Sequence, residues 1–226
     1  MCDGIVGPPP LPFSGVWDSW VFIAEPINGM VLGPLPGFLS SLIGVFAGHS
    51  VSFRGTPEYL FTLGMPIGAA VSGMIFRRKW KIPLVYYAAL LAMFFVTPVS
   101  WQLPFWGMWD IYLAFVLLLT LIPIMKRYET VWGFGSNNTK LLLTVSVCAF
   151  IGLEADVLFR IFILVPCQTY RVVFYSMKVA DLQYIWTIGA IETSIKATLS
   201  AIVSATVVPS IIIVVRKLGL NSATLG

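Results

Sequence analysis

The chain has 226 residues, of which 58% are hydrophobic and only 11% are charged, and its mean hydropathy is +0.89. Soluble domains carry about 25% charged residues, so this composition excludes an ordinary soluble protein and predicts one that crosses the bilayer several times. At about 20 residues a span, the length allows six or seven membrane segments and no soluble domain. The net charge of +4 comes from basic residues in short connections, where they act as topology signals and give no nucleic-acid-binding pattern.

The start of the chain does not resemble a signal peptide. Residues 1–17 contain an aspartate, no basic residue and the run Pro8-Pro9-Pro10, whereas a signal peptide has a positive region followed by an apolar core. We therefore expect residues 1–18 to form an irregular segment within a single transmembrane domain that covers residues 1–226.

Hydrophobic runs separated by turn-rich segments predict an all-α, polytopic transmembrane bundle. The runs lie at about 20–48, 59–76, 82–99, 105–125, 141–165 and 185–215. The first run is interrupted at Gly33-Pro34-Leu35-Pro36, where two prolines remove backbone donors. This run is either one kinked helix or a hairpin of two short helices, and of the two we favour the hairpin.

Basic residues are distributed unevenly between the connections. One set of connections carries nine of them: Arg77, Arg78, Lys79, Lys81, Lys126, Arg127, Lys140, Arg216 and Lys217. The opposite set carries only Arg54, Arg171 and Lys178. Because cytoplasmic loops are enriched in Lys and Arg, we expect a multi-pass protein of the cell (plasma) membrane with a cytoplasmic C-terminus.

The connections on the predicted outer side, 49–58, 100–106 and 167–184, are rich in aromatic residues. An interfacial belt of Trp and Tyr explains each residue singly, and an aromatic-lined pocket is the alternative. The 17-residue connection from Cys167 to Gln183 is long enough to cover such a pocket.

Six ionisable residues lie inside apolar stretches: Asp110, Glu154, Asp156, Arg160, Glu192 and Lys196. A charge at the bilayer centre costs about 2.5–3.5 kcal/mol, so such residues usually face the interior of a bundle and mark a site. Asp156 with Arg160, and Glu192 with Lys196, are spaced four residues apart with the acid first, which favours intrahelical pairs. Pairing alone also explains how the charges are tolerated, so a purely structural role stays open. Glu154 is two residues from Asp156 and therefore points about 200° away around the helix. It either contacts a neighbouring helix or is protonated, because burial favours the neutral carboxyl.

The two pairs and Asp110 share one depth in the outer half of the predicted bundle. Sites with a few convergent polar groups among aromatic side chains suit a flat or heterocyclic solute. We therefore predict a substrate-binding site made of Asp110, Asp156, Arg160, Glu192, Lys196, Trp106, Trp109 and Trp186.

No catalytic or metal-binding pattern accompanies these charges. The sequence contains no HExxH, GxSxG or Walker loop, and its three cysteines are scattered. His49, the single histidine, is predicted to be an interface residue at the end of a span. The sequence therefore predicts neither an enzyme nor a bound metal or cofactor.

Several motifs resemble the substrate-binding S components of energy-coupling-factor (ECF) vitamin transporters. They are Gly33-Pro34-Leu35-Pro36-Gly37-Phe38-Leu39, Leu60-Phe61-Thr62-Leu63-Gly64, Gly73-Met74-Ile75-Phe76-Arg77-Arg78-Lys79, and the stretch from Ile195-Lys196-Ala197 through Val215-Arg216-Lys217. The resemblance covers about half of the chain. It implies a membrane subunit that binds a vitamin-like molecule from the outside and docks on a transmembrane coupling protein driven by two ATP-binding subunits.

Small residues recur every three or four positions on three predicted helices: Gly37, Ser41, Gly44 and Gly48; Gly64, Gly68, Ser72 and Gly73; and Ala197, Ala201 and Ala205. Such stripes let helices pack closely within a bundle. For the alanine stripe, a groove for a partner's helices is the alternative.

Three hypotheses compete with the solute-binding subunit. The chain could be an accessory subunit whose buried pairs only fix helix register. It could be a proton-coupled carrier in which Glu154 or Glu192 titrates. A membrane enzyme has least support, because no nucleophile or metal arrangement accompanies the carboxylates.

Overall fold

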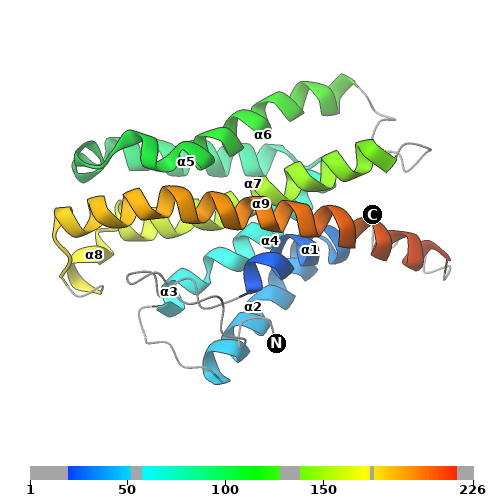
Figure 1. Ribbon diagram of the computed structural model, residues 1–226, viewed down its shortest axis with the longest axis horizontal. Coiled ribbons are helices and arrows are strands. Elements are labelled where there is room, and N and C mark those ends of the chain that lie inside the picture. Colours follow the sequence, from blue (N-terminus) through cyan, green and yellow to red (C-terminus); the bar gives the residue numbers. More distant parts are fainter. Residues whose placement is uncertain (1–19, 52–57, 128–137, 174–175, 218–226) are drawn as a thin grey trace.

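The structure is a computed structural model, and it describes residues 20–51, 58–127, 138–173 and 176–217. Every regular element in these ranges is helical, which confirms the predicted all-α bundle (Figure 1). The α-helices are α1 (Val21–Leu32), α2 (Pro34–Val51), α3 (Glu58–Thr62), α4 (Gly64–Phe76), α5 (Lys81–Val96), α6 (Trp109–Arg127), α7 (Asn138–Leu164), α8 (Thr169–Val172) and α9 (Val179–Lys217). Two 3₁₀ helices, η3 (Pro98–Gln102) and η4 (Phe105–Met108), connect α5 to α6. The predicted irregular segment 1–18 lies outside the described residues.

Five helical stretches are long and apolar enough to cross a membrane. They are Pro34–Val51, Tyr59–Phe76, Phe105–Ile124, Thr139–Leu164 and Val179–Val215. Helices α1 and α5 are apolar but shorter, with 12 and 16 residues. The predicted six or seven membrane segments are therefore reached only if one or both of these short helices are counted with the five long stretches.

The first hydrophobic run is a helical hairpin, as favoured from the sequence. The turn is at Gly33, whose φ of 104° is a conformation that glycine adopts easily. Val21 and Val45, which lie on opposite sides of this turn, belong to one buried cluster. A Cβ added to Gly37 would come within 2.7 Å of the Gly29 Cα, so α1 and α2 approach closely next to the turn.

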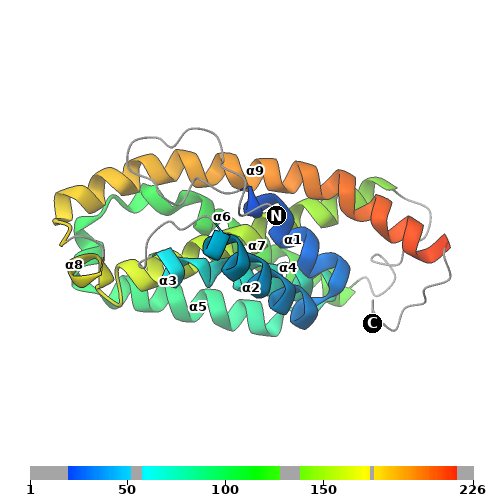
Figure 2. The same cartoon turned by 90° about the horizontal axis from the view of Figure 1, so that it is seen from below.

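Helices α5, α6, α7 and α9 run in one general direction, whereas α2 lies obliquely to them (Figures 1 and 2). Helix α8 and the two 3₁₀ helices lie at one end. The end of α6, the start of α7 and the last turns of α9 lie at the opposite end. The distribution of Lys and Arg had assigned these two ends to opposite sides of the membrane.

Helix α4 is packed between α1, α2 and α7, and its small residues make this possible. A Cβ added to Gly29 of α1 would lie 1.7 Å from the Ala69 carbonyl oxygen of α4. A Cβ added to Gly152 of α7 would lie 2.6 Å from the Ser72 Cβ of α4. Real Cβ atoms do not approach other atoms so closely, so these helices pack backbone to backbone. The close packing predicted for the glycine stripe of α4 is confirmed.

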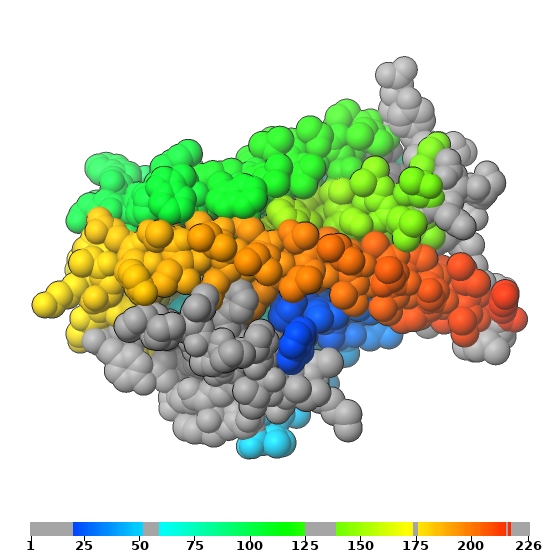
Figure 3. Space-filling model, viewed as in Figure 1, coloured from blue at the N-terminus to red at the C-terminus, as the bar shows by residue number. Residues whose placement is uncertain are grey.

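The alanine stripe of α9 does not form an open groove at its start. Ala197 is completely buried and packs with Phe22 and Leu153. Figure 3 shows α9 lying along one face of the molecule, and its exposed large side chains are Tyr184, Ile191, Ile195, Leu199, Ile202, Ile213 and Val214. Ala197 therefore packs inside the bundle against α1 and α7. Ala201 and Ala205 are only partly buried, so a groove for a partner's helix along the rest of the stripe stays a prediction.

Candidate functional site

Ionisable side chains from three helices come together where α1 and α7 pack against each other and against both α4 and α9. We call this place the junction, and it consists of Glu25 of α1, Gly64 and Gly68 of α4, Asp156 and Arg160 of α7, and Lys196 of α9. It combines residues that are up to 171 positions apart in the sequence, from Glu25 to Lys196.

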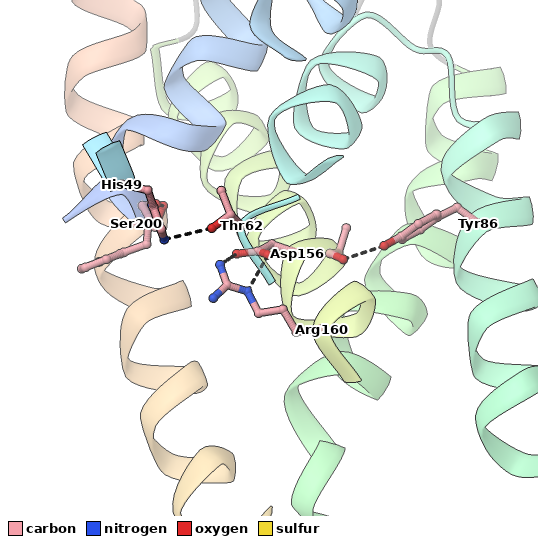
Figure 4. A network of polar contacts seen from close by, with 8 residues as sticks. His49, Thr62, Tyr86, Asp156, Arg160 and Ser200 are labelled. Atoms are coloured by element: carbon pink, nitrogen blue, oxygen red, sulfur yellow. Dashed lines mark hydrogen bonds and ion pairs between the residues drawn. The ribbon is translucent and has the colours of Figure 1, made fainter. Parts of the chain in front are cut away.

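The centre of the junction is an ion pair within α7. Arg160 Nε donates to Asp156 Oδ1 at 2.7 Å, and a terminal guanidinium nitrogen of Arg160 donates to Asp156 Oδ2 at 2.6 Å (Figure 4). Such a two-bond contact is among the strongest that charged side chains make. A Cβ added to Gly64 would lie 1.8 Å from Asp156 Oδ1, so the carboxylate rests against the backbone of α4. The intrahelical pair predicted from the four-residue spacing is confirmed.

Glu25 lies beside this pair and was missed by the sequence reasoning. Its side chain is 1% exposed, and neither carboxylate oxygen has a hydrogen-bond partner among the described residues. It interacts electrostatically with Asp156, Arg160 and Glu154. A Cβ added to Gly68 would lie 1.7 Å from Glu25 Oε1. An acidic residue inside the hydrophobic run 20–48 is the same signal that selected the other six ionisable residues.

A proline in α1 determines how α1 is held against α9. Pro26 has no N–H to give to the Phe22 carbonyl one turn earlier. The hydroxyl of Ser200 on α9 donates to this carbonyl at 2.8 Å. In a bundle that excludes water, a freed backbone carbonyl needs such a partner from a neighbouring helix. This contact brings the α1 segment that carries Glu25 to α9.

Lys196 reaches the junction from α9. Its ammonium nitrogen lies 5.5 Å from the centre of the Phe22 ring, a cation–π distance. Its positive charge also interacts with the Asp156 carboxylate. Glu192 is buried one turn earlier on the same helix. The structure therefore brings Asp156, Arg160 and Lys196 together, as the shared depth predicted.

Asp110 makes a separate contact with α9. Its Oδ2 accepts hydrogen bonds from the hydroxyls of Thr193 and Ser194, the latter at 3.1 Å, and its Oδ1 accepts from the Ile111 amide at 2.9 Å. Sequence reasoning missed Thr193 and Ser194, two adjacent hydroxyl residues in an apolar helix. Glu154 interacts electrostatically with Asp110 and Asp156. Neither of its carboxylate oxygens has a hydrogen-bond partner in the described part of the chain.

The three predicted tryptophans have different environments. Trp186 is buried and stacks on Phe94 with the ring centres 5.8 Å apart. Trp106 is 53% exposed, and Trp109 is 47% exposed while its Nε1 donates to the Ala190 carbonyl at 3.0 Å. The exposed pair fits the interfacial belt, and Trp186 belongs to the apolar core. The structure does not gather the three into one stacking surface.

His49 is a buried structural residue rather than the interface residue predicted from its place at a span end. Its Nε2 lies 3.0 Å from the Thr62 hydroxyl (Figure 4), and its Nδ1 lies 3.2 Å from the Val45 carbonyl oxygen. Its ring also contacts the Tyr59 ring at 5.3 Å between centres. These contacts tie α2 to α3. Among the described residues, no group of three or more His, Cys, Asp or Glu side chains could hold a metal ion.

No protein-family model, curated protein or solved structure matches the chain. The functional argument therefore rests on the residues of the site. Chemically, the junction places both signs of charge in a largely water-free setting, where unpaired charged groups are costly.

Proposed function

We propose that the chain is a membrane-embedded subunit of a transport system and that it binds its solute at the junction. The observation that carries this proposal is Glu25, a fully buried carboxylate beside the Asp156–Arg160 pair with no hydrogen-bond partner among the described residues. If the Asp156–Arg160 pair served only to let α7 enter the membrane, the buried Glu25 on α1 would have no role. An unsatisfied buried carboxylate is costly, and a bound solute would relieve this cost.

The direction of transport in this proposal comes from the distribution of charge along the chain. The end of the bundle with α8 and the two 3₁₀ helices would face outward, and the C-terminus would be cytoplasmic. Arg160 lies one turn before the end of α7 at Leu164, so it is close to that outer end. Solute would then be captured from the outside.

The resemblance to ECF S components supports a vitamin-like, aromatic or heterocyclic solute and ATP-driven uptake. On this proposal the partners are a transmembrane coupling protein and its ATPase subunits. Because Ala197 is buried, docking on the coupling protein would use another surface than this residue.

A proton-coupled carrier is the second candidate, and Glu154 is the observation that favours it. This buried carboxyl has no hydrogen-bond partner in the described part of the chain and interacts with the charge of Asp110. Uptake that follows a proton gradient and continues without an ATPase would favour the carrier over the ATP-driven subunit.

The test is the identification of small molecules that copurify with the protein from membranes of its native host. After extraction in mild detergent, the protein is denatured and the released molecules are identified by mass spectrometry. We expect one solute in near-stoichiometric amount and its loss from the Arg160→Gln variant. The Arg78→Gln variant, altered in the connection after α4, should retain it. Wild-type protein that releases no specific molecule would contradict the proposal.

A further inference from the structure

The junction also indicates the charge of the solute. We propose that Glu25 binds a positively charged group, so that the solute is an organic cation carrying an amine, amidine or charged heterocycle. This inference rests on the proposed function, because it names the substrate class of the same site.

The first argument is the hydrogen-bonding need of Glu25. An ionised carboxylate accepts about four hydrogen bonds, and both oxygens of Glu25 are buried without a partner among the described residues. Protonation would remove the charge but would leave a hydroxyl without an acceptor from the same residues. A cationic N–H group of a ligand satisfies the charge and the hydrogen bonds together.

The second argument is the balance of buried charge within the bundle. The described helices bury five carboxylates, those of Glu25, Asp110, Glu154, Asp156 and Glu192. Within the same apolar stretches they place only two basic side chains, Arg160 and Lys196. Arg160 is already held by two hydrogen bonds to Asp156. An anionic solute would add to an excess of negative charge, whereas a cationic solute would reduce it.

The third argument is the position of the carboxylate. Gly68 has no side chain, and this lets Glu25 Oε1 lie against the backbone of α4. Phe22 lies three residues before Glu25, on the same side of α1, and its ring already attracts the Lys196 ammonium at 5.5 Å. An aromatic face and a carboxylate side by side are features that recognise an organic cation.

The experiment compares wild type with Glu25→Gln and with Asp181→Asn as a control. Asp181 also loses a carboxylate in this substitution, but it is exposed at the start of α9, where it accepts a hydrogen bond from the Lys178 amide at 2.8 Å, and it does not belong to the junction. Solutes that copurify with each variant are quantified, and their charge at pH 7 is determined. We expect a cation, at least a tenfold loss of it in Glu25→Gln, and wild-type retention in Asp181→Asn.

Two outcomes would overturn this inference while leaving the proposed function intact. One is a retained solute that is neutral or anionic, and the other is full retention of a cation by a folded Glu25→Gln variant. Absence of any solute from wild type would instead overturn the proposed function. If Glu25→Gln does not fold, the thermal unfolding of wild type is compared in benzylamine and in benzyl alcohol. We expect the cationic probe to raise the unfolding midpoint more, and an equal shift would contradict the inference.

Discussion

Replacing Ser200 by alanine tests how the bundle satisfies the carbonyl that Pro26 frees in α1. Ser200 is fully buried and donates to the Phe22 carbonyl at 2.8 Å. Its loss leaves a buried acceptor unpaired, which costs about 1–3 kcal/mol. Because 1.4 kcal/mol corresponds to a factor of about ten, we expect the ratio of folded to unfolded protein to fall by a factor between about 5 and about 140.

The matched control is Ser204→Ala, one turn further along α9. Ser204 is also fully buried, but its hydroxyl has no hydrogen-bond partner among the described residues. Alanine at this position removes an unpaired polar group, so stability should stay the same or rise. Both variants are measured by unfolding in mixed detergent micelles with increasing SDS, followed by tryptophan fluorescence.

A second substitution, Pro26→Ala, separates the effect of this hydrogen bond on stability from the effect of general packing. Pro26→Ala restores an N–H that can donate to the Phe22 carbonyl within α1. The free energy of unfolding should therefore fall less on Ser200→Ala in the Pro26→Ala background than in the wild type. Equal losses in the two backgrounds, or equal effects of Ser200→Ala and Ser204→Ala, would refute the reasoning.

Three further predictions follow from the packing, the ion pair and the topology. Gly29→Ala should lower the free energy of unfolding by about 1–3 kcal/mol or more through overpacking, because its Cβ would lie 1.7 Å from a backbone oxygen of α4. In the same unfolding assay Gly44→Ala should be neutral or stabilising, because a Cβ added there meets no atom within 4 Å. Asp156→Asn and Arg160→Gln should each lower the free energy of unfolding by about 3–5 kcal/mol, and the double variant should lower it by clearly less than the sum of the two. Additive losses would show that the two side chains do not stabilise each other. In a variant that keeps exposed Cys167 as its single cysteine, a membrane-impermeant maleimide should label intact cells, and labelling only after permeabilisation would invert the proposed topology.

Much of the fold was predictable because it depends on patterns that are local in sequence. Hydrophobic runs gave the long helices, and two prolines beside Gly33 indicated the break between α1 and α2. The Asp156–Arg160 pair was predictable for the same reason, since residues four apart on a helix face each other whatever the helix packs against. The glycine stripe of α4 likewise indicated a close helix contact, although not which helices make it.

The arrangement around the junction depended on the tertiary structure. The Ser200–Phe22 hydrogen bond joins residues 178 positions apart, and the contacts of Asp110 with Thr193 and Ser194 span 83 and 84 positions. No periodicity in one segment indicates which face of a distant helix it will meet. Aromatic composition also could not separate Trp186, which is buried, from the exposed Trp106 and Trp109.

The sequence by itself determined that this is a helical bundle with charges inside apolar stretches, because hydropathy and helical spacing are properties of single segments. Only the tertiary structure decided that Glu25 joins Asp156, Arg160 and Lys196. That juxtaposition requires α1 and α7 to pack on α4 and α9 to pack on α1 and α7. The approach to α4 is set by the close contacts at Gly29, Gly64 and Gly68. The sequence shows only that a glycine has no side chain, whereas the tertiary structure shows which group of a neighbouring helix fills the space left by the missing Cβ.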